Sequence, residues 1–81
     1  MGTVTCDRVA RPAWAALPAY ERQAIEAAIP VDCRLTVLAR TGPRDLTVRL
    51  FAGGEQLSMA RGRHIDQTCW NALAGAGIRP R

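Results

Sequence analysis

Three runs of the chain, residues 31–40, 46–52 and 55–60, alternate between apolar and polar side chains. Successive side chains of a β-strand point to opposite faces, so this alternation predicts three strands that each bury one face. The expected inner face comprises Leu35, Val37, Ala39, Val48, Leu50, Leu57 and Met59. The expected outer face comprises Arg34, Thr36, Leu38, Arg40, Thr47, Arg49, Phe51, Gln56 and Ser58.

The first connection, Gly42-Pro43-Arg44-Asp45, has the composition of a tight turn. Proline presets φ at the second position of such a turn, and Gly and Asp suit its ends. A two-residue loop at its centre would pair Val37 with Leu50. A slip of one residue would bring Arg49 into the apolar set, so the pattern and the turn predict the same register.

The second connection, Gly53-Gly54, can adopt the positive φ angles that two-residue hairpins require. This loop would pair Leu50 with Leu57. The same loop would also pair Val48 with Met59, the next residues on that face of the two strands. Both turns therefore predict one three-stranded antiparallel sheet in the order 1-2-3, with one apolar face that needs a cover.

A helix is expected before the strands and another after them, at residues 18–29 and 64–74. The first helix has Pro18 in its opening turn, where proline is tolerated, and ends before Pro30. Its apolar side is expected to begin with Tyr20. The second helix has an apolar stripe at helical spacing, and Trp70 lies at the edge of that stripe. The stripe consists of Ile65, Cys69, Ala72 and Leu73.

The expected order is αβββα, an α+β fold in which both helices pack on one face of the sheet. The glycine-rich residues 75–77 end the second helix. A chain of 81 residues is expected to form a single domain, 1–81. It includes an N-terminal segment, 1–12, to which no element is assigned, and a basic tail, 78–81.

Charge narrows the choice of partners. The net charge is +4, and every basic residue is an arginine. A basic surface attracts acidic partners, either nucleic acid or an acidic protein surface. The chain has no apolar run near the roughly 20 residues that cross a bilayer, so no membrane is expected among its partners.

The side chains that usually carry out catalysis are sparse. His64 is the single histidine, and no serine or acid is spaced to form a triad with it. Cys69 lies five residues further on, which places it on a different side of a helix from His64. The chain contains no C-x-x-C pair of the kind that anchors a zinc site. We therefore expect a protein that is not an enzyme and needs no cofactor or metal.

The three cysteines do not form an even disulfide framework. Cys33 and Cys69 fall on the expected inner faces, where a thiol behaves as a small apolar group. Cys6 lies in the unassigned segment and is expected to be the most exposed. A homodimer, with or without a disulfide at Cys6, is one assembly that the sequence allows.

Two surfaces are candidates for binding. The first is the outer sheet face, where arginines surround an aromatic residue, a composition typical of interface cores. It comprises Arg34, Leu38, Arg40, Arg49 and Phe51. The second lies at the first turn and the start of the last helix, where backbone amides favour anions. It comprises Arg44, Arg61, Arg63 and His64.

The αβββα order and the Gly42-Pro43 pair resemble a double-stranded-RNA-binding domain. That family contacts RNA through its first helix, this loop and the start of its last helix. The resemblance implies RNA contacts at Arg22, Gln23, Arg44, Arg61, Arg63 and His64. The chain departs from the family at two places. Asp45 stands where the family's loop has a histidine, and residues 64–67 stand where the family has a lysine cluster.

In size and type the chain is similar to the small proteins with which phages and mobile elements disable host defences, above all anti-CRISPR proteins. This resemblance implies a non-enzymatic inhibitor that occupies a protein or nucleic-acid site on a nucleoprotein effector. The expected partner is a protein subunit of that effector, and the expected location is the cytoplasm, of the host cell if the chain is phage-encoded. The alternative is a direct nucleic-acid-binding domain.

Overall fold

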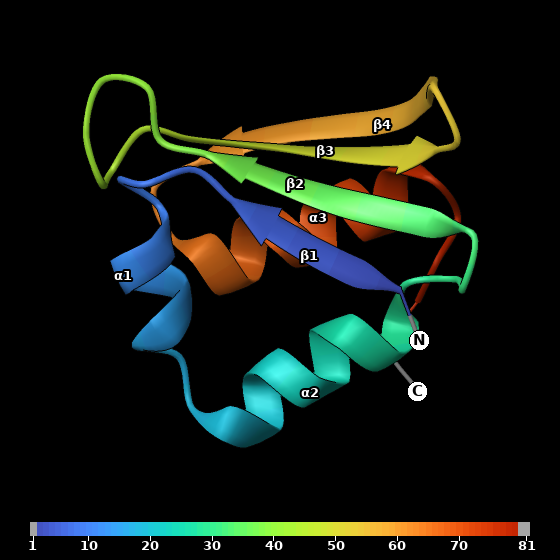
Figure 1. Cartoon of the computed structure of the whole chain (residues 1–81), viewed down its shortest axis with the longest axis horizontal. Helices are drawn as coiled ribbons and strands as arrows, with labels where there is room; N and C mark the ends of the chain where they lie inside the picture. The colour runs from blue at the N-terminus through green and yellow to red at the C-terminus, as the bar shows by residue number, and fades with distance from the viewer. Residues whose placement is uncertain (1, 80–81) are drawn as a thin grey trace.

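A four-stranded sheet forms one layer of the structure, and the helices form a second layer on one side of it (Figure 1). The computed structural model describes residues 2–79 and shows an α+β fold. The elements in chain order are β1 (Thr3–Cys6), α1 (Arg11–Ala15), α2 (Ala19–Ala28), β2 (Cys33–Leu38), β3 (Leu46–Ala52), β4 (Glu55–Gly62) and α3 (Ile65–Gly75). None of the helices in residues 2–79 has an apolar stretch long enough to cross a bilayer.

The sheet is mixed, so the prediction of a three-stranded antiparallel sheet was wrong. Strand β1 pairs in parallel with β2, with Val4 opposite Leu35, and the strand order is β1-β2-β3-β4. Parallel neighbours need a long crossover, which α1 and α2 supply. Only four residues form β1. An alternation that short carries no periodic signal, so the sequence predicts no element in residues 1–12.

Strands β2 and β3 are antiparallel as predicted, but their register differs by two residues. Val37 lies opposite Val48 rather than opposite Leu50. A shift of two keeps each side chain on its face, so Leu35, Val37 and their neighbours still point into the core. The tight turn itself is confirmed, since the Asp45 amide donates to the Gly42 carbonyl at 3.1 Å.

The register differs because residues 39–45 form a longer connection than the predicted two-residue loop. Asp7 bonds the start of this connection on the β1 side of β2. The Ala39 amide donates to one carboxylate oxygen of Asp7 at 2.9 Å, and the Ala10 amide donates to the other at 2.7 Å. One carboxylate thus joins the end of β1, the start of α1 and the end of β2.

Strand β4 does not have the predicted register. A bulge between the Leu50 and Phe51 pairs places Ser58 opposite Leu50 and Met59 opposite Arg49. Leu57 and Met59, predicted to be buried, are 43% and 50% exposed. The hairpin turn is nevertheless as predicted, because Gly53 has a φ of +61°. The bulge, one extra residue on β4, reverses the faces beyond it.

The inward side of β4 consists of small residues, and α3 packs against it. Ser58 donates from its hydroxyl to the Ala72 carbonyl of α3. At Gly62 an added Cβ would lie 2.5 Å from the Thr68 hydroxyl oxygen, so only glycine permits this approach. Larger side chains at these positions would hold the helix away from the sheet.

Helix α3 agrees closely with the predicted 64–74 helix. Ile65, Cys69, Ala72 and Leu73 are buried as predicted, and Thr68 joins them. The helix stops as expected, with Gly77 at a φ of +82°. The predicted basic tail begins differently, because Ile78 packs against the core; residues 80–81 of that tail lie outside the described residues.

Helix α2 agrees with the predicted 18–29 helix, and Ile25 of its predicted apolar side is buried. Tyr20, predicted on the same side, is instead 73% exposed. Glu21 turns toward α3 and accepts a hydrogen bond from the Trp70 indole at 3.3 Å. Both helices lie on the same side of the sheet, as the sequence predicts (Figure 1).

Replacing Gly62 with alanine should destabilise the fold by about 1–3 kcal/mol, because the new methyl group overlaps the Thr68 hydroxyl. Urea unfolding measures the loss. Gly54→Ala is the matched control, since a Cβ there meets nothing within 4 Å. Adding Thr68→Ala to Gly62→Ala should restore most of the stability. Equal stability of the two single glycine variants would contradict this packing.

Acid should destabilise the fold through Asp7. The Ala39 amide, and then the Ala10 amide, hold the pKa of this carboxyl below its ordinary value of 3.8. A carboxyl whose pKa is lower in the folded state stabilises the fold above its unfolded pKa, and this stabilisation is lost as pH falls below about 3.8. Denaturant midpoints from pH 6 to pH 2 should fall less steeply for Asp7→Asn than for the exposed-site control Glu55→Gln. Parallel curves would contradict the assignment.

Candidate binding face

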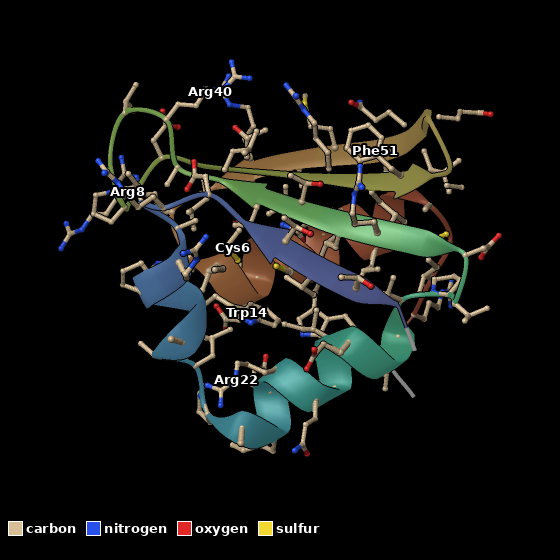
Figure 2. The ribbon with its side chains drawn as sticks, in the orientation of Figure 1. Cys6, Arg8, Trp14, Arg22, Arg40 and Phe51 are labelled. Carbon is tan, nitrogen blue, oxygen red and sulfur yellow. The ribbon has the colours of Figure 1, made fainter. Side chains whose placement is uncertain are left out.

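One face of the sheet, here called the outer face, has no helix of the described chain over it (Figure 1). Figure 2 shows Arg40 and Phe51 on this side, away from Trp14 and Arg22, which lie among the helices. The strand pairing places polar, basic and apolar side chains together there. They are Arg34, Thr36, Leu38, Thr47, Arg49, Phe51, Met59 and Arg61.

The arginines of the outer face follow a diagonal across three strands. Arg34 of β2 lies opposite Phe51, two residues beyond Arg49 on β3. Arg61 of β4 lies opposite Thr47, two residues before Arg49. Diagonal neighbours in an antiparallel sheet are about 7–8 Å apart. The diagonal therefore presents three guanidinium groups in order, and Arg49 is the central one.

Phe51 is less available than the sequence suggested. The Arg34 guanidinium carbon lies 5.8 Å from the centre of the Phe51 ring, a cation–π contact. Phe51 is half-buried, and the exposed apolar surface of this face comes more from Met59. The aromatic ring thus positions Arg34 and does not offer a free stacking surface.

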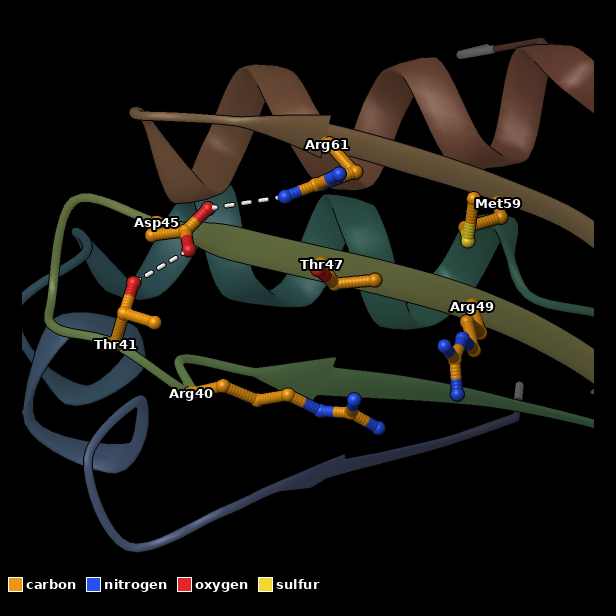
Figure 3. Close-up of a pocket in the computed structure, with 7 residues that line it drawn as sticks. All are labelled: Arg40, Thr41, Asp45, Thr47, Arg49, Met59 and Arg61. Atoms are coloured by element: carbon orange, nitrogen blue, oxygen red, sulfur yellow. Dashed lines mark hydrogen bonds and ion pairs between the residues drawn. The ribbon is translucent and has the colours of Figure 1, made fainter.

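A shallow depression opens at one end of the outer face (Figure 3). Arg61 and Asp45 form an ion pair at 3.7 Å between side chains that are 67% and 44% exposed, so it contributes little. Asp45 also accepts a hydrogen bond from the Thr41 hydroxyl at 2.5 Å. The full lining is Arg40, Thr41, Asp45, Thr47, Arg49, Met59 and Arg61. This lining contains one carboxylate and three arginines.

Among residues 2–79, no carboxylate forms an ion pair with Arg40 or Arg49. In Figure 3 the Arg40 side chain extends along the sheet toward Arg49, while Arg61 points the other way, to Asp45. The Nε of Arg49 is buried and has no hydrogen-bond partner among the described residues. An unsatisfied buried donor costs about 1–3 kcal/mol. Because this atom is buried, an anion in the depression would contact the terminal nitrogens of Arg49 and not the Nε.

The residues predicted for the outer face are together in the structure. Arg34, Leu38, Arg49 and Phe51 share the sheet surface, and Arg40 reaches it from the loop after β2. Met59 and Thr47 belong to the same surface. Sequence reasoning placed Met59 on the inner face because its register ignored the bulge. The small residues at Ser58, Ala60 and Gly62 were the available signal.

The second predicted surface is divided. Arg61 belongs to the outer face, because β4 extends to Gly62. Arg44 and Arg63 remain together and line a separate depression beside the loop between β2 and β3. His64 is exposed at the position before α3, and its side chain does not cap the helix.

Arg22, an RNA contact under the double-stranded-RNA-binding resemblance, has a structural role. Its guanidinium donates to the Ala15 carbonyl at 2.9 Å and to the Leu17 carbonyl. Ala15 is the last residue of α1 and Leu17 lies in the connection to α2, so Arg22 joins the two helices of the crossover. An RNA phosphate would have to compete with both contacts.

The cysteines lie in surroundings that suppress thiol reactivity. Burial raises the pKa of Cys69 to about 12, and burial also raises the pKa of Cys6 and Cys33. Thiols with raised pKa values are poor nucleophiles at neutral pH. Cys6 is half-buried rather than exposed, so the disulfide-linked homodimer remains a prediction. In residues 2–79 no group of three or more His, Cys, Asp or Glu residues could hold a metal ion.

No family model, curated protein or solved structure matches this chain. Neither the double-stranded-RNA-binding nor the anti-CRISPR resemblance gains support from a relative. The geometry of the outer face therefore carries the functional argument.

Proposed function

We propose that this chain is a small non-enzymatic binding protein that occupies a site on a partner with its outer face. One observation carries the proposal: all helices of the described chain lie on one side of the sheet, and the other side gathers Arg34, Arg40, Arg49 and Arg61 around apolar side chains. Arginine, methionine and aromatic residues are enriched in protein interfaces.

A protein partner fits this face better than a nucleic acid does. Single-stranded nucleic acids bind to sheets by stacking bases on free aromatic rings. Phe51 lies under the Arg34 guanidinium. Met59, at 50% exposure, instead offers flexible apolar surface beside the arginines. Apolar side chains among cations suit a protein surface that carries carboxylates.

The mode of action that we propose is inhibition by steric occupation, as in the anti-CRISPR proteins that the chain resembles in size and type. The partner would be a subunit of a nucleoprotein effector, and the chain would act in the cytoplasm of the cell that contains it. A basic face on a rigid sheet can cover an acidic surface without a catalytic group or cofactor.

The alternative is direct nucleic-acid binding through Arg44, Arg63 and His64. The observation that favours it is the depression that Arg44 and Arg63 line together. Arg61, the remaining member of that predicted set, faces the other surface and is paired with Asp45. The alternative therefore has fewer cations than the sequence suggested.

The double variant Arg49→Ala/Phe51→Ala should reduce partner capture from the native host at least tenfold. Both changes remove interface surface while leaving the inner core of the sheet in place. The matched control is Arg44→Ala with Arg63→Ala, which removes more positive charge from the other depression. Circular dichroism and urea unfolding establish that each variant folds. Equal capture by the outer-face variant and the wild type would refute the proposal.

Titration with labelled double-stranded RNA and DNA at 50 and 200 mM salt tests the alternative. Phosphate contacts release counterions, so a direct binder would show tight binding that weakens steeply with salt. We expect weak binding at 50 mM salt that changes little in Arg44→Ala/Arg63→Ala. Tight binding that this variant abolishes would establish the alternative instead.

A further inference from the structure

The outer face already binds one carboxylate, that of Asp45, and a carboxylate is the group that it could recognise in a partner. Asp45 lies at the edge of the depression, paired with Arg61 and hydrogen-bonded to the Thr41 hydroxyl. At the opposite end, Arg40 extends toward Arg49 with no carboxylate between them (Figure 3). Arg40 and Arg49 line the same depression, so their like charges repel and a bound anion would relieve the repulsion.

The buried Nε of Arg49 leaves the terminal Nη groups as the donors that a ligand can reach. Arg49 lines the depression together with Arg40. A carboxylate binds a guanidinium through two parallel hydrogen bonds, which the fork of arginine matches and an ammonium does not. An acceptor that reaches the Nη groups of Arg49 from the open side would also neutralise Arg40.

We propose that the outer face binds an extended acidic segment of a protein, with one carboxylate between Arg40 and Arg49 and a second one at the next arginine along the diagonal. This inference rests on the proposed function and names the chemistry of its partner. Alternate side chains of an extended segment are about 6.6–6.8 Å apart. Diagonal neighbours such as Arg49 and Arg61, or Arg49 and Arg34, are about 7–8 Å apart. Acids at alternate positions therefore match successive arginines.

The apolar side chains favour this ligand over a phosphate backbone. Met59 lies opposite Arg49, in the same row of the sheet, and is 50% exposed. Leu38, opposite Thr47, is half-buried. In an extended segment the residues between the acids point away from the sheet, so the methylene groups of the acidic side chains are what contacts Met59 and Leu38. A phosphate backbone has no such apolar stem beside its charge.

A capped peptide with glutamate at three alternate positions, Ala-Glu-Ala-Glu-Ala-Glu-Ala, is the probe. Its matched control replaces each glutamate with glutamine, and an oligothymidylate of equal charge represents a phosphate backbone. The readout is the Nε–Hε resonance of Arg49 in a nitrogen-15 NMR titration at 50 mM salt. We expect this resonance to shift with the glutamate peptide at a lower concentration than with the other two probes.

Variants separate the site from net charge. Arg49→Gln should weaken binding of the glutamate peptide about tenfold, the effect of losing a charge-assisted hydrogen-bonded pair. Arg49→Lys keeps the charge but not the fork and should weaken it about threefold. Arg79→Gln, on the segment after α3 that runs to the helix side of the sheet (Figure 1), should change it less than twofold.

Each other outcome overturns the inference. Equal binding of the glutamate and glutamine peptides, or an unmoved Arg49 resonance, would exclude a carboxylate site. Tighter binding of the oligothymidylate would identify the face as a phosphate site. Loss of partner capture in Arg49→Ala/Phe51→Ala, together with peptide binding that Arg49→Gln leaves unchanged, would overturn this inference but retain the proposed function.

Discussion

Close packing of α3 on β4 is the constraint on which the rest of the structure depends. The helix approaches the strand where Gly62 faces Thr68 and the Ser58 hydroxyl reaches the Ala72 carbonyl. Larger side chains on this side of the strand would separate the two elements and open the core around Leu73. The small residues of β4 must therefore point inward, and its large ones must point outward.

This constraint also creates the binding face. The hairpin turn alone would place Met59 inside and Ser58 outside, and the bulge at Leu57 reverses them. The reversal adds Met59 and Arg61 to the surface that Arg49 occupies. The bulge removes one position from the strand ladder and leaves Leu57 partly exposed. In return, it places Met59 and the arginine of a third strand, Arg61, on the outer face. The register of β4 against β3 therefore determines both the packing of α3 and the composition of the outer face.

The Asp7 carboxylate organises the β1 edge of the sheet. It accepts hydrogen bonds from Ala10 and Ala39 and so joins the start of α1 to the chain just after β2. Residues 39–45 follow as a loop, which positions Arg40 over the sheet and Asp45 beside Arg61. Asp7 lies outside the candidate site, yet it holds the start of the loop that carries Arg40.

The sequence by itself determined the two long helices, the three antiparallel strands and both tight turns, because periodicity, proline and glycine act over a few neighbouring residues. It placed Arg49 on the outer face for the same reason. Only the tertiary structure decided the register, since the long connection after β2 is held by Asp7 and the bulge on β4 serves the packing of α3, and both partners come from distant parts of the chain. Strand β1 likewise needed β2 beside it, because four residues show no period and gain their stability from pairing.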